Sequence, residues 1–234
     1  NRQAVSIVSE YNFAPTENAK ANLLREGRDG SKIYVTGNTA IDALKTTVRD
    51  DYTHPELEWA AGSRLILITA HRRENLGEPM HHMFRAIRRV MDEHPDVRAI
   101  YPIHMNPVVR RAADEELGGC DRIHIIEPLE VLDCHNIMAK SYMILTDSGG
   151  IQEEAPSLGK PVLVMRDTTE RPEGIAAGTL RLVGTDEEVI YDNFRRLLED
   201  KDAYNAMAHA ANPYGDGLAS RRIADILEFG KTDI

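Results

Sequence analysis

The sequence predicts an α/β fold built on a doubly wound parallel sheet with helices on both faces. From residue 65 onward, short runs of apolar and β-branched residues alternate with segments in which apolar residues recur at helical spacing, the rhythm of strand–helix–strand units. The first run, residues 65–69, is apolar or β-branched throughout, as in a parallel strand buried on both faces. Ligands of such sheets bind beyond the carboxyl ends of the strands.

The residues before this regular part predict fewer elements. We expect a helix over residues 18–25 that ends at Gly27, a short strand over residues 32–36 and a helix over residues 39–48. Residues 49–62 contain a pair of Asp, a Pro and the single Trp without periodicity, which predicts a linker.

The regular part predicts six strands, each followed by at least one helix. The expected strands are residues 65–69, 97–101, 123–126, 142–146, 161–165 and 179–183. The expected helices are residues 80–93, 107–117, 131–139, 151–158, 169–177, 186–199 and 202–210, with a terminal helix over residues 219–229.

Composition narrows the class of protein. The chain has 234 residues, 42% of them hydrophobic, which suits a globular protein rather than a disordered one. A net charge of −10 argues against a nucleic-acid surface, and no apolar run reaches the length of a membrane span. Cys120 and Cys134 show neither metal-ligand spacing nor a disulfide framework, so we expect a cytoplasmic protein.

The most informative stretch is residues 145–155. A strand ends there at Ser148, Gly149 and Gly150, and a helix-like segment follows. Backbone N–H groups at the start of a helix attract anions, and glycines let a phosphate approach the main chain. The alternative is purely structural, with Asp147 or Ser148 capping the helix and the Gly pair forming a tight turn.

Four loops place basic side chains at the same edge of the predicted sheet. His71 and Arg72 follow the first strand, His104 follows the second, the Gly pair follows the fourth, and Arg171 follows the fifth. Two or three fixed arginines beside a helix start suit a diphosphate, because a guanidinium can engage two oxygens at once. We therefore expect no metal and no cofactor. Arg171 could instead simply pair with Glu170 or Glu173.

Two further side chains have a functional and a structural interpretation. Glu154 lies one turn after the Gly pair, where its carboxylate could accept hydrogen bonds from ribose hydroxyls or only favour the helix dipole. His71 could protonate a departing phosphate near neutral pH, or it could be a structural histidine.

Five ordered motifs resemble those of the non-hydrolysing UDP-N-acetylglucosamine 2-epimerases of bacteria, and the resemblance covers essentially the whole chain. They are Thr-Ala-His-Arg-Arg-Glu-Asn at residues 69–75, Tyr-Pro-Ile-His-Met-Asn-Pro at residues 101–107, the run over residues 145–156, the run over residues 164–172, and Asn-Pro-Tyr-Gly-Asp-Gly at residues 212–217.

The resemblance implies two Rossmann-like domains in the GT-B arrangement. It also implies interconversion of UDP-N-acetylglucosamine and UDP-N-acetylmannosamine by anti-elimination and re-addition of UDP. Ser148, Gly149, Gly150 and Arg171 would bind the diphosphate, and Glu154 would bind the ribose. His71 would assist the UDP leaving group.

The same resemblance implies regulation and partners. Arg72 and His104 would contact a second, allosteric UDP-N-acetylglucosamine molecule. The expected partners are UDP and a UDP-N-acetylhexosamine, with no nucleic acid and no membrane, and the full-length protein is expected to be a homodimer. Cys134 stands where related sequences usually have an aromatic residue against the uracil.

The resemblance also predicts the domain organisation. Residues 1–52 would be the end of an N-terminal domain and linker, residues 53–212 the UDP-binding C-terminal domain, and residues 213–234 a helix crossing back to the first domain. We expect this chain to be a fragment without the proton-transferring carboxylates. The alternatives are a GT-B glycosyltransferase and a non-catalytic module that senses UDP-sugars.

Overall fold

The computed structural model describes residues 1–230, and the chain separates into two compact units. One unit comprises residues 1–46 together with the chain from Asn212 onward, and the other comprises Thr47–Ala211. The roles predicted for the two domains stay predictions.

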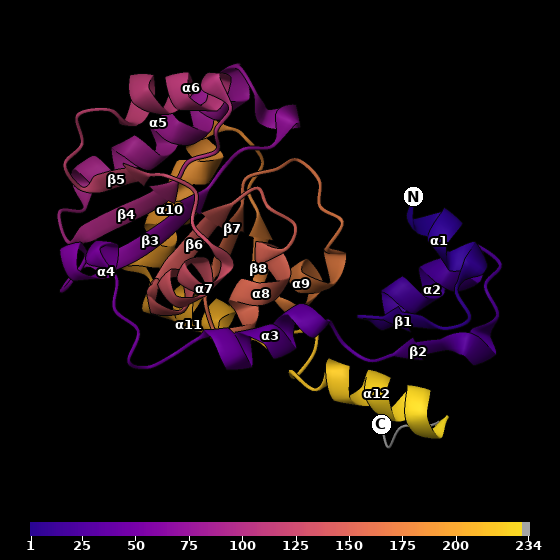
Figure 1. Ribbon diagram of the computed structural model, residues 1–234. Helices are drawn as coiled ribbons and strands as arrows, with labels where there is room; N and C mark the ends of the chain where they lie inside the picture. The colour runs from indigo at the N-terminus through magenta and orange to yellow at the C-terminus, as the bar shows by residue number, and fades with distance from the viewer. Residues whose placement is uncertain (231–234) are drawn as a thin grey trace. The chain divides into compact units, whose positions relative to one another are not determined.

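The larger unit contains six strands in a single parallel sheet, in the order β5-β4-β3-β6-β7-β8. Figure 1 shows β3 in the interior of the sheet, with β4 on one side and β6 on the other. This order places the topological switch between β3 and β6, where doubly wound sheets bind ligands. The strands are β3 (Arg64–Thr69), β4 (Val97–Pro102), β5 (Ile123–Ile126), β6 (Met143–Thr146), β7 (Val162–Val164) and β8 (Leu180–Leu182).

Helices cover both faces of this sheet. They are α4 (Pro55–Trp59), α5 (Glu78–Glu93), α6 (Pro107–Leu117), α7 (Val131–Lys140), α8 (Ile151–Ser157), α9 (Pro172–Ala177), α10 (Glu187–Glu199) and α11 (Lys201–Ala208), with a 3₁₀ turn over Arg73–Asn75. None of the helices within residues 1–230 is long and apolar enough to cross a membrane.

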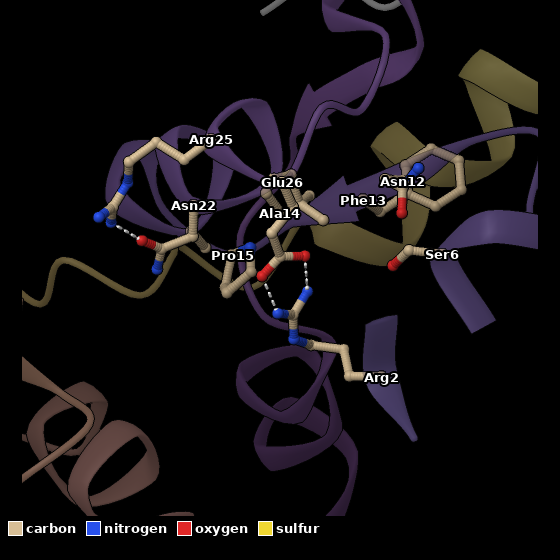
Figure 2. A pocket seen from close by; sticks show the side chains of 11 residues that line it. Arg2, Ser6, Asn12, Phe13, Ala14, Pro15, Asn22, Arg25 and Glu26 are labelled. Atoms are coloured by element: carbon tan, nitrogen blue, oxygen red, sulfur yellow. Dashed lines mark hydrogen bonds and ion pairs between the residues drawn. The ribbon is translucent and has the colours of Figure 1, made fainter. Parts of the chain in front are cut away.

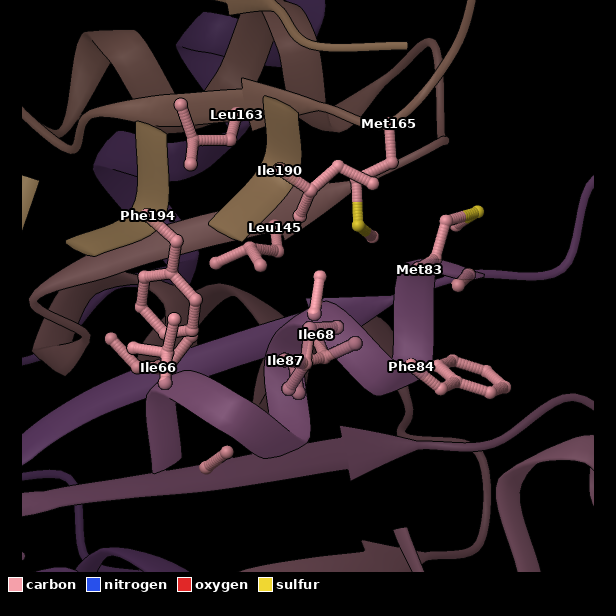
Figure 3. Packing of buried hydrophobic residues seen from close by; sticks show 14 of the residues in the cluster. Ile66, Ile68, Met83, Phe84, Ile87, Leu145, Leu163, Met165, Ile190 and Phe194 are labelled. Atoms are coloured by element: carbon pink, nitrogen blue, oxygen red, sulfur yellow. The ribbon is translucent and has the colours of Figure 1, made fainter. Parts of the chain in front are cut away.

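Burial explains why the strands are apolar on both faces. Ile66 and Ile68 pack into the core formed with α5 and α10, as Figure 3 shows, while Leu67, which points to the other face, is also fully buried. The β-branched and apolar side chains of β3 therefore suit its place in the interior of the sheet. The doubly wound parallel sheet predicted from the sequence is confirmed.

One expected linker contains a helix. Within residues 49–62, α4 begins at Pro55, and the His54 side chain caps it by accepting a hydrogen bond from the Glu56 N–H at 3.2 Å. Trp59 stacks on the ring of His124 from β5 with centroids 3.4 Å apart. The helix has only 5 residues, too few to show a helical period.

The smaller unit is built around two parallel strands, β1 (Asn12–Ala14) and β2 (Ile33–Val35). Neither β1 nor the first helix was expected from the sequence. The helices of this unit are α1 (Arg2–Val8), α2 (Glu17–Arg25), α3 (Thr39–Thr47), whose last residue begins the larger unit, and α12 (Ala219–Phe229), with a 3₁₀ turn over Gly30–Lys32.

The motif at residues 212–217 has a structural role in this unit. The Asn38 N–H donates to the Tyr214 carbonyl at 2.8 Å, and a Cβ added to Gly37 would lie 3.3 Å from the Gly215 Cα. Gly37 has φ of +91°, so glycine is favoured there for its backbone conformation as well as for the close approach. The carboxylate of Asp42 accepts from the Ala219 N–H at 3.1 Å at the start of α12.

Candidate functional site

The sheet order brings the four predicted loops together. β4, β3, β6 and β7 are consecutive neighbours in one parallel sheet, so their carboxyl ends lie at the same edge. His104, His71 and Arg72, the Gly pair, and Arg171 all follow these strands.

Asp147 organises the loop after β3. Its carboxyl group is fully buried, and Oδ2 accepts hydrogen bonds from the N–H groups of His71 and Arg72, both at 2.8 Å, and from Asn75 Nδ2 at 3.2 Å. The other oxygen, Oδ1, faces the His71 Nδ1 at 3.6 Å. One carboxylate therefore fixes the backbone that carries both basic side chains and also faces the imidazole ring.

The structural alternative for Asp147 and Ser148 is wrong. The N-cap of α8 is Gly150, which has no side chain to bond with. Thr146 Oγ1 accepts from the Ser148 N–H at 2.9 Å, and Gln152 Nε2 donates to the Ser148 carbonyl at 3.1 Å. The turn is thus held by its neighbours, and Asp147 bonds to the loop after β3 instead of capping α8.

Two guanidinium groups converge on Gly149. A Cβ added there would lie 3.4 Å from Arg72 Nη2 and 3.6 Å from Arg171 Nη2. Arg72 is oriented by its Nε, which donates to the Asp147 carbonyl at 3.2 Å. Arg171 is oriented by an ion pair between its Nε and the buried carboxylate of Glu153. Two arginines from the loops after β3 and β7 therefore flank one glycine in a turn.

Arg166, in the same loop as Arg171, has a different environment. Its side chain is buried, its Nε donates to Glu74 Oε1 at 2.8 Å, and its terminal nitrogens donate to both oxygens of Glu170 at 2.8 and 3.0 Å. This hydrogen bonding lowers the pKa of Glu170 to about 2. Glu170 thus bonds with Arg166, a partner that the sequence did not indicate.

Glu154 lies beside the Gly pair in largely buried surroundings. A Cβ added to Gly150 would lie 3.7 Å from Glu154 Oε1, and the other oxygen, Oε2, lies 3.7 Å from His135 Nε2. Burial, and then the charge of Glu153, raise the pKa of Glu154. Burial first and then Glu154 raise the pKa of Cys134 to about 11, which keeps this thiol protonated at neutral pH.

The two histidines of the site stack on each other. The rings of His71 and His104 are 5.6 Å apart between centroids and inclined by 10°. This contact brings the ends of β3 and β4 together, as expected from the strand order.

Several residues that shape the site were not singled out from the sequence. Asn75 donates to Asp147 and also to the Met165 carbonyl at 3.1 Å, and Thr169 Oγ1 donates to Gln152 Oε1 at 2.5 Å. The sequence offers one signal for such contacts, a polar residue directly after a buried strand, and only Asp147 shows it. The others lie in loops or helices whose contacts depend on the tertiary fold.

A separate cavity lies in the smaller unit. It has a volume of about 450 Å³ and is lined by α1, β1 and α2. Figure 2 shows that the charged side chains in it pair with neighbours in the same cavity, Arg2 with Glu26 and Arg25 with Asn22. None of the site residues predicted above line it. Within residues 1–230, no group of three or more His, Cys, Asp or Glu side chains is placed to hold a metal ion.

Comparison with known proteins identifies the family. The family model described as UDP-N-acetylglucosamine 2-epimerase matches residues 1–228. This chain belongs to that family. The UDP-N-acetylglucosamine 2-epimerase of Bacillus subtilis (strain 168) is 62% identical over 229 residues, which cover 98% of this chain and 60% of that protein. The resemblance recognised from the sequence motifs is confirmed for the family, and the non-hydrolysing subtype stays a prediction.

Solved structures support the same assignment. A UDP-N-acetylglucosamine 2-epimerase structure described as putative, from Listeria monocytogenes, is 56% identical with a TM-score of 0.94, covering 100% of this chain and 63% of that chain. S. aureus MnaA, solved as a co-structure with UDP, is 52% identical with a TM-score of 0.94. The match covers 98% of this chain and 63% of the MnaA chain. The Rossmann-like fold class of the GT-B type is thus confirmed. The chain spans about 60% of the length of the curated relative from Bacillus subtilis.

Proposed function

We propose that the turn at Ser148, Gly149 and Gly150 binds the diphosphate of UDP. The observation that carries the proposal is the convergence of Arg72 and Arg171 on Gly149. Guanidinium groups form paired hydrogen bonds with phosphate oxygens and stay charged at every working pH. A glycine without a Cβ leaves the space between them open for those oxygens. The co-structure of S. aureus MnaA with UDP supports a nucleoside diphosphate as the ligand.

Glu154 would bind the ribose. Its raised pKa shows that burial disfavours the charged carboxylate, so hydroxyl donors from the ribose would stabilise this group more than they would a solvated one. Its place beside Gly150 sets it within one turn of the proposed diphosphate position.

His71 would assist departure of UDP from the sugar. In the reaction proposed for the full-length protein, the non-hydrolysing route, a base removes the proton from the second sugar carbon. The bond from the first carbon to the UDP oxygen then breaks, and UDP re-adds after a proton returns on the other face. Asp147 Oδ1, 3.6 Å from His71 Nδ1, would orient the ring so that Nε2 faces the leaving group, and a ring with hydrogens on both nitrogens would donate the one on Nε2 to the departing oxygen.

This chain would contribute the UDP side of that reaction. We propose that the carboxylates moving the proton lie outside it, so the isolated chain binds UDP and does not epimerise, because proton removal needs a positioned base. Arg72, which also lies beside the proposed diphosphate position, and His104 would contact a second UDP-N-acetylglucosamine molecule. The stacking of His104 on His71 supports such a neighbouring position. A homodimer of the full-length protein and a cytoplasmic location stay predictions.

The test is incubation of this chain, and separately of the full-length protein, with UDP-N-acetylglucosamine in D₂O, followed by NMR. The full-length protein should form UDP-N-acetylmannosamine with deuterium at the second sugar carbon, and the chain alone should form none. Turnover by the chain at the full-length rate would contradict the division of roles. Turnover without deuterium would contradict proton removal at that carbon.

A further inference from the structure

The first residues of the larger unit, 47–52, form hydrogen bonds with α7. Thr47 Oγ1 lies 2.8 Å from His135 Nδ1, the Arg49 N–H donates to Asn136 Oδ1 at 2.8 Å, and Asn136 Nδ2 donates back to the Thr47 carbonyl at 2.8 Å. Tyr52 Oη donates to Asp133 Oδ1 at 2.6 Å. All of these groups belong to the larger unit.

His135 connects this segment to Glu154. The side chain is buried, and its two ring nitrogens face different groups: Nδ1 faces the hydroxyl of Thr47, and Nε2 faces Glu154 Oε2 at 3.7 Å. Burial lowers the pKa of His135, which favours the neutral ring. A neutral imidazole has one donor nitrogen and one acceptor nitrogen.

The surroundings select one tautomer. The Thr47 hydroxyl can donate to Nδ1, which leaves the hydrogen on Nε2 and directs it at the carboxylate of Glu154. The opposite tautomer would place an acceptor lone pair opposite a carboxylate oxygen, which is repulsive. The 2.8 Å contact with the Thr47 hydroxyl is compatible with this tautomer, in which the ring directs its N–H toward Glu154, as partners of other histidine rings orient theirs.

We propose that His135, oriented by Thr47, is a positioning residue that holds the Glu154 carboxylate for the ribose hydroxyls of UDP. This rests on the proposed function, since it assumes that Glu154 meets the ribose. At 3.7 Å the contact between Nε2 and Oε2 is longer than a hydrogen bond. In this proposal the N–H of His135 attracts the carboxylate and closes to hydrogen-bond distance when Glu154 receives the ribose hydroxyls.

The test measures affinity for UDP and for 2′-deoxy-UDP by calorimetry on the 234-residue chain. His135→Leu should weaken UDP binding about tenfold, the effect of one hydrogen bond to a charged group. It should weaken 2′-deoxy-UDP binding less, by no more than about threefold, because one of the ribose hydroxyls that Glu154 receives is missing from that ligand. A structural role for His135 would weaken both ligands equally.

Two replacements of His135 separate its two nitrogens. Gln places an amide donor where Nε2 lies, whereas Asn reaches only to the position of Nδ1. His135→Gln should restore UDP affinity to within about threefold of the wild type, and His135→Asn should behave like the Leu variant. Thr47→Val removes the orienting hydroxyl at nearly constant volume and should also weaken UDP more than 2′-deoxy-UDP.

Tyr52→Phe is the matched control, because it removes another hydrogen bond between the same segment and α7 without touching Glu154. It should leave the ratio of the two affinities unchanged. Equal weakening of both ligands by the His135 variants, or no weakening of UDP, would overturn the inference while UDP binding stands. A wild-type chain that binds no UDP would overturn the proposed function and this inference with it. If the Leu variant does not fold, the Gln–Asn pair and Thr47→Val decide.

Discussion

The two arginines of the loop between β7 and α9 have opposite environments. Arg166 is buried and pairs with two exposed carboxylates, those of Glu74 and Glu170, and we call these three residues the Arg166 cluster. Arg171 shares the edge of the sheet with Arg72 and Gly149, and we call these three the Gly149 rim. Arg166 and Arg171 are five positions apart in one loop. The charge of Arg166 is neutralised by two carboxylates, whereas Arg171 lies beside a second cation, Arg72.

The difference separates a stabilising role from a binding role. In the Arg166 cluster each nitrogen of the guanidinium donates to a carboxylate of the same unit, so a ligand would gain little there. In the Gly149 rim, Arg171 is oriented by the carboxylate of Glu153 and directs a terminal nitrogen at a backbone turn. Nearby like charges repel, which favours an anion between them.

Asp147 is the residue whose loss should affect both regions most strongly. Asp147→Ala leaves two N–H groups without an acceptor and removes one of the two acceptors of the Asn75 amide in a buried site. We expect a loss of about 3–5 kcal/mol in the free energy of unfolding. Asp147→Asn keeps one oxygen and should lose about half as much. Urea denaturation measures both. An Ala variant as stable as the wild type would show that the loop after β3 does not depend on this carboxylate.

Arg166→Lys should sharpen the comparison by affecting stability alone. Lysine cannot reproduce the fork that engages Glu74 and Glu170, so the free energy of unfolding should fall by about 2 kcal/mol. UDP affinity should stay within about threefold of the wild type. Loss of UDP binding in a folded Arg166→Lys protein would remove the distinction between the two regions.

Arg171→Lys is the reciprocal substitution. It keeps a cation beside Glu153 but loses the second nitrogen directed at Gly149, so UDP affinity should fall about tenfold with less than about 1 kcal/mol lost in stability. Arg195→Lys, on the exposed face of α10, is the control and should change neither quantity. Calorimetry gives the affinities and denaturation the stabilities.

The smallest expected effect is a change in stability at acid pH. The pKa of Glu170 is lowered from 4.5 to about 2, so its contribution to stability is present above pH 4.5 and is lost as the pH falls toward 2. The contribution is modest because the side chain is about half exposed. Glu170→Gln should be less stable than the wild type at pH 7, and the gap should narrow steadily below pH 4.5. A gap independent of pH would contradict the ion pair with Arg166.

The sequence predicted the elements of the larger unit because strands and helices alternate there in a regular order and the longer helices show a helical period. The helices over Pro107–Leu117 and Ala219–Phe229 and the strand over Ile123–Ile126 have the expected bounds. The elements α1, β1 and α4, of 3 to 7 residues, escaped prediction because they lie outside that alternation and are too short to show a period of their own.

The site was predictable as a gathering of loops but not as a set of contacts. The loops that follow parallel strands lie at one edge of the sheet. The sequence therefore predicted that His71, His104, Gly149 and Arg171 lie near one another. The direction of the Asp147 carboxylate could not be read locally, because capping α8 and holding the loop after β3 are both open to an Asp in that position. The pairing of Arg171 with Glu153 likewise depends on how α8 packs against the loop after β7.

The central claim is that the Gly149 rim binds the diphosphate, and calorimetry with UDP and with uridine tests it most directly. UDP should bind the wild-type chain at least about tenfold more tightly than uridine, from charge-assisted hydrogen bonds to Arg72 and Arg171. Arg171→Lys should reduce that ratio while leaving uridine affinity unchanged. Equal affinity of the wild-type chain for UDP and uridine would contradict the claim.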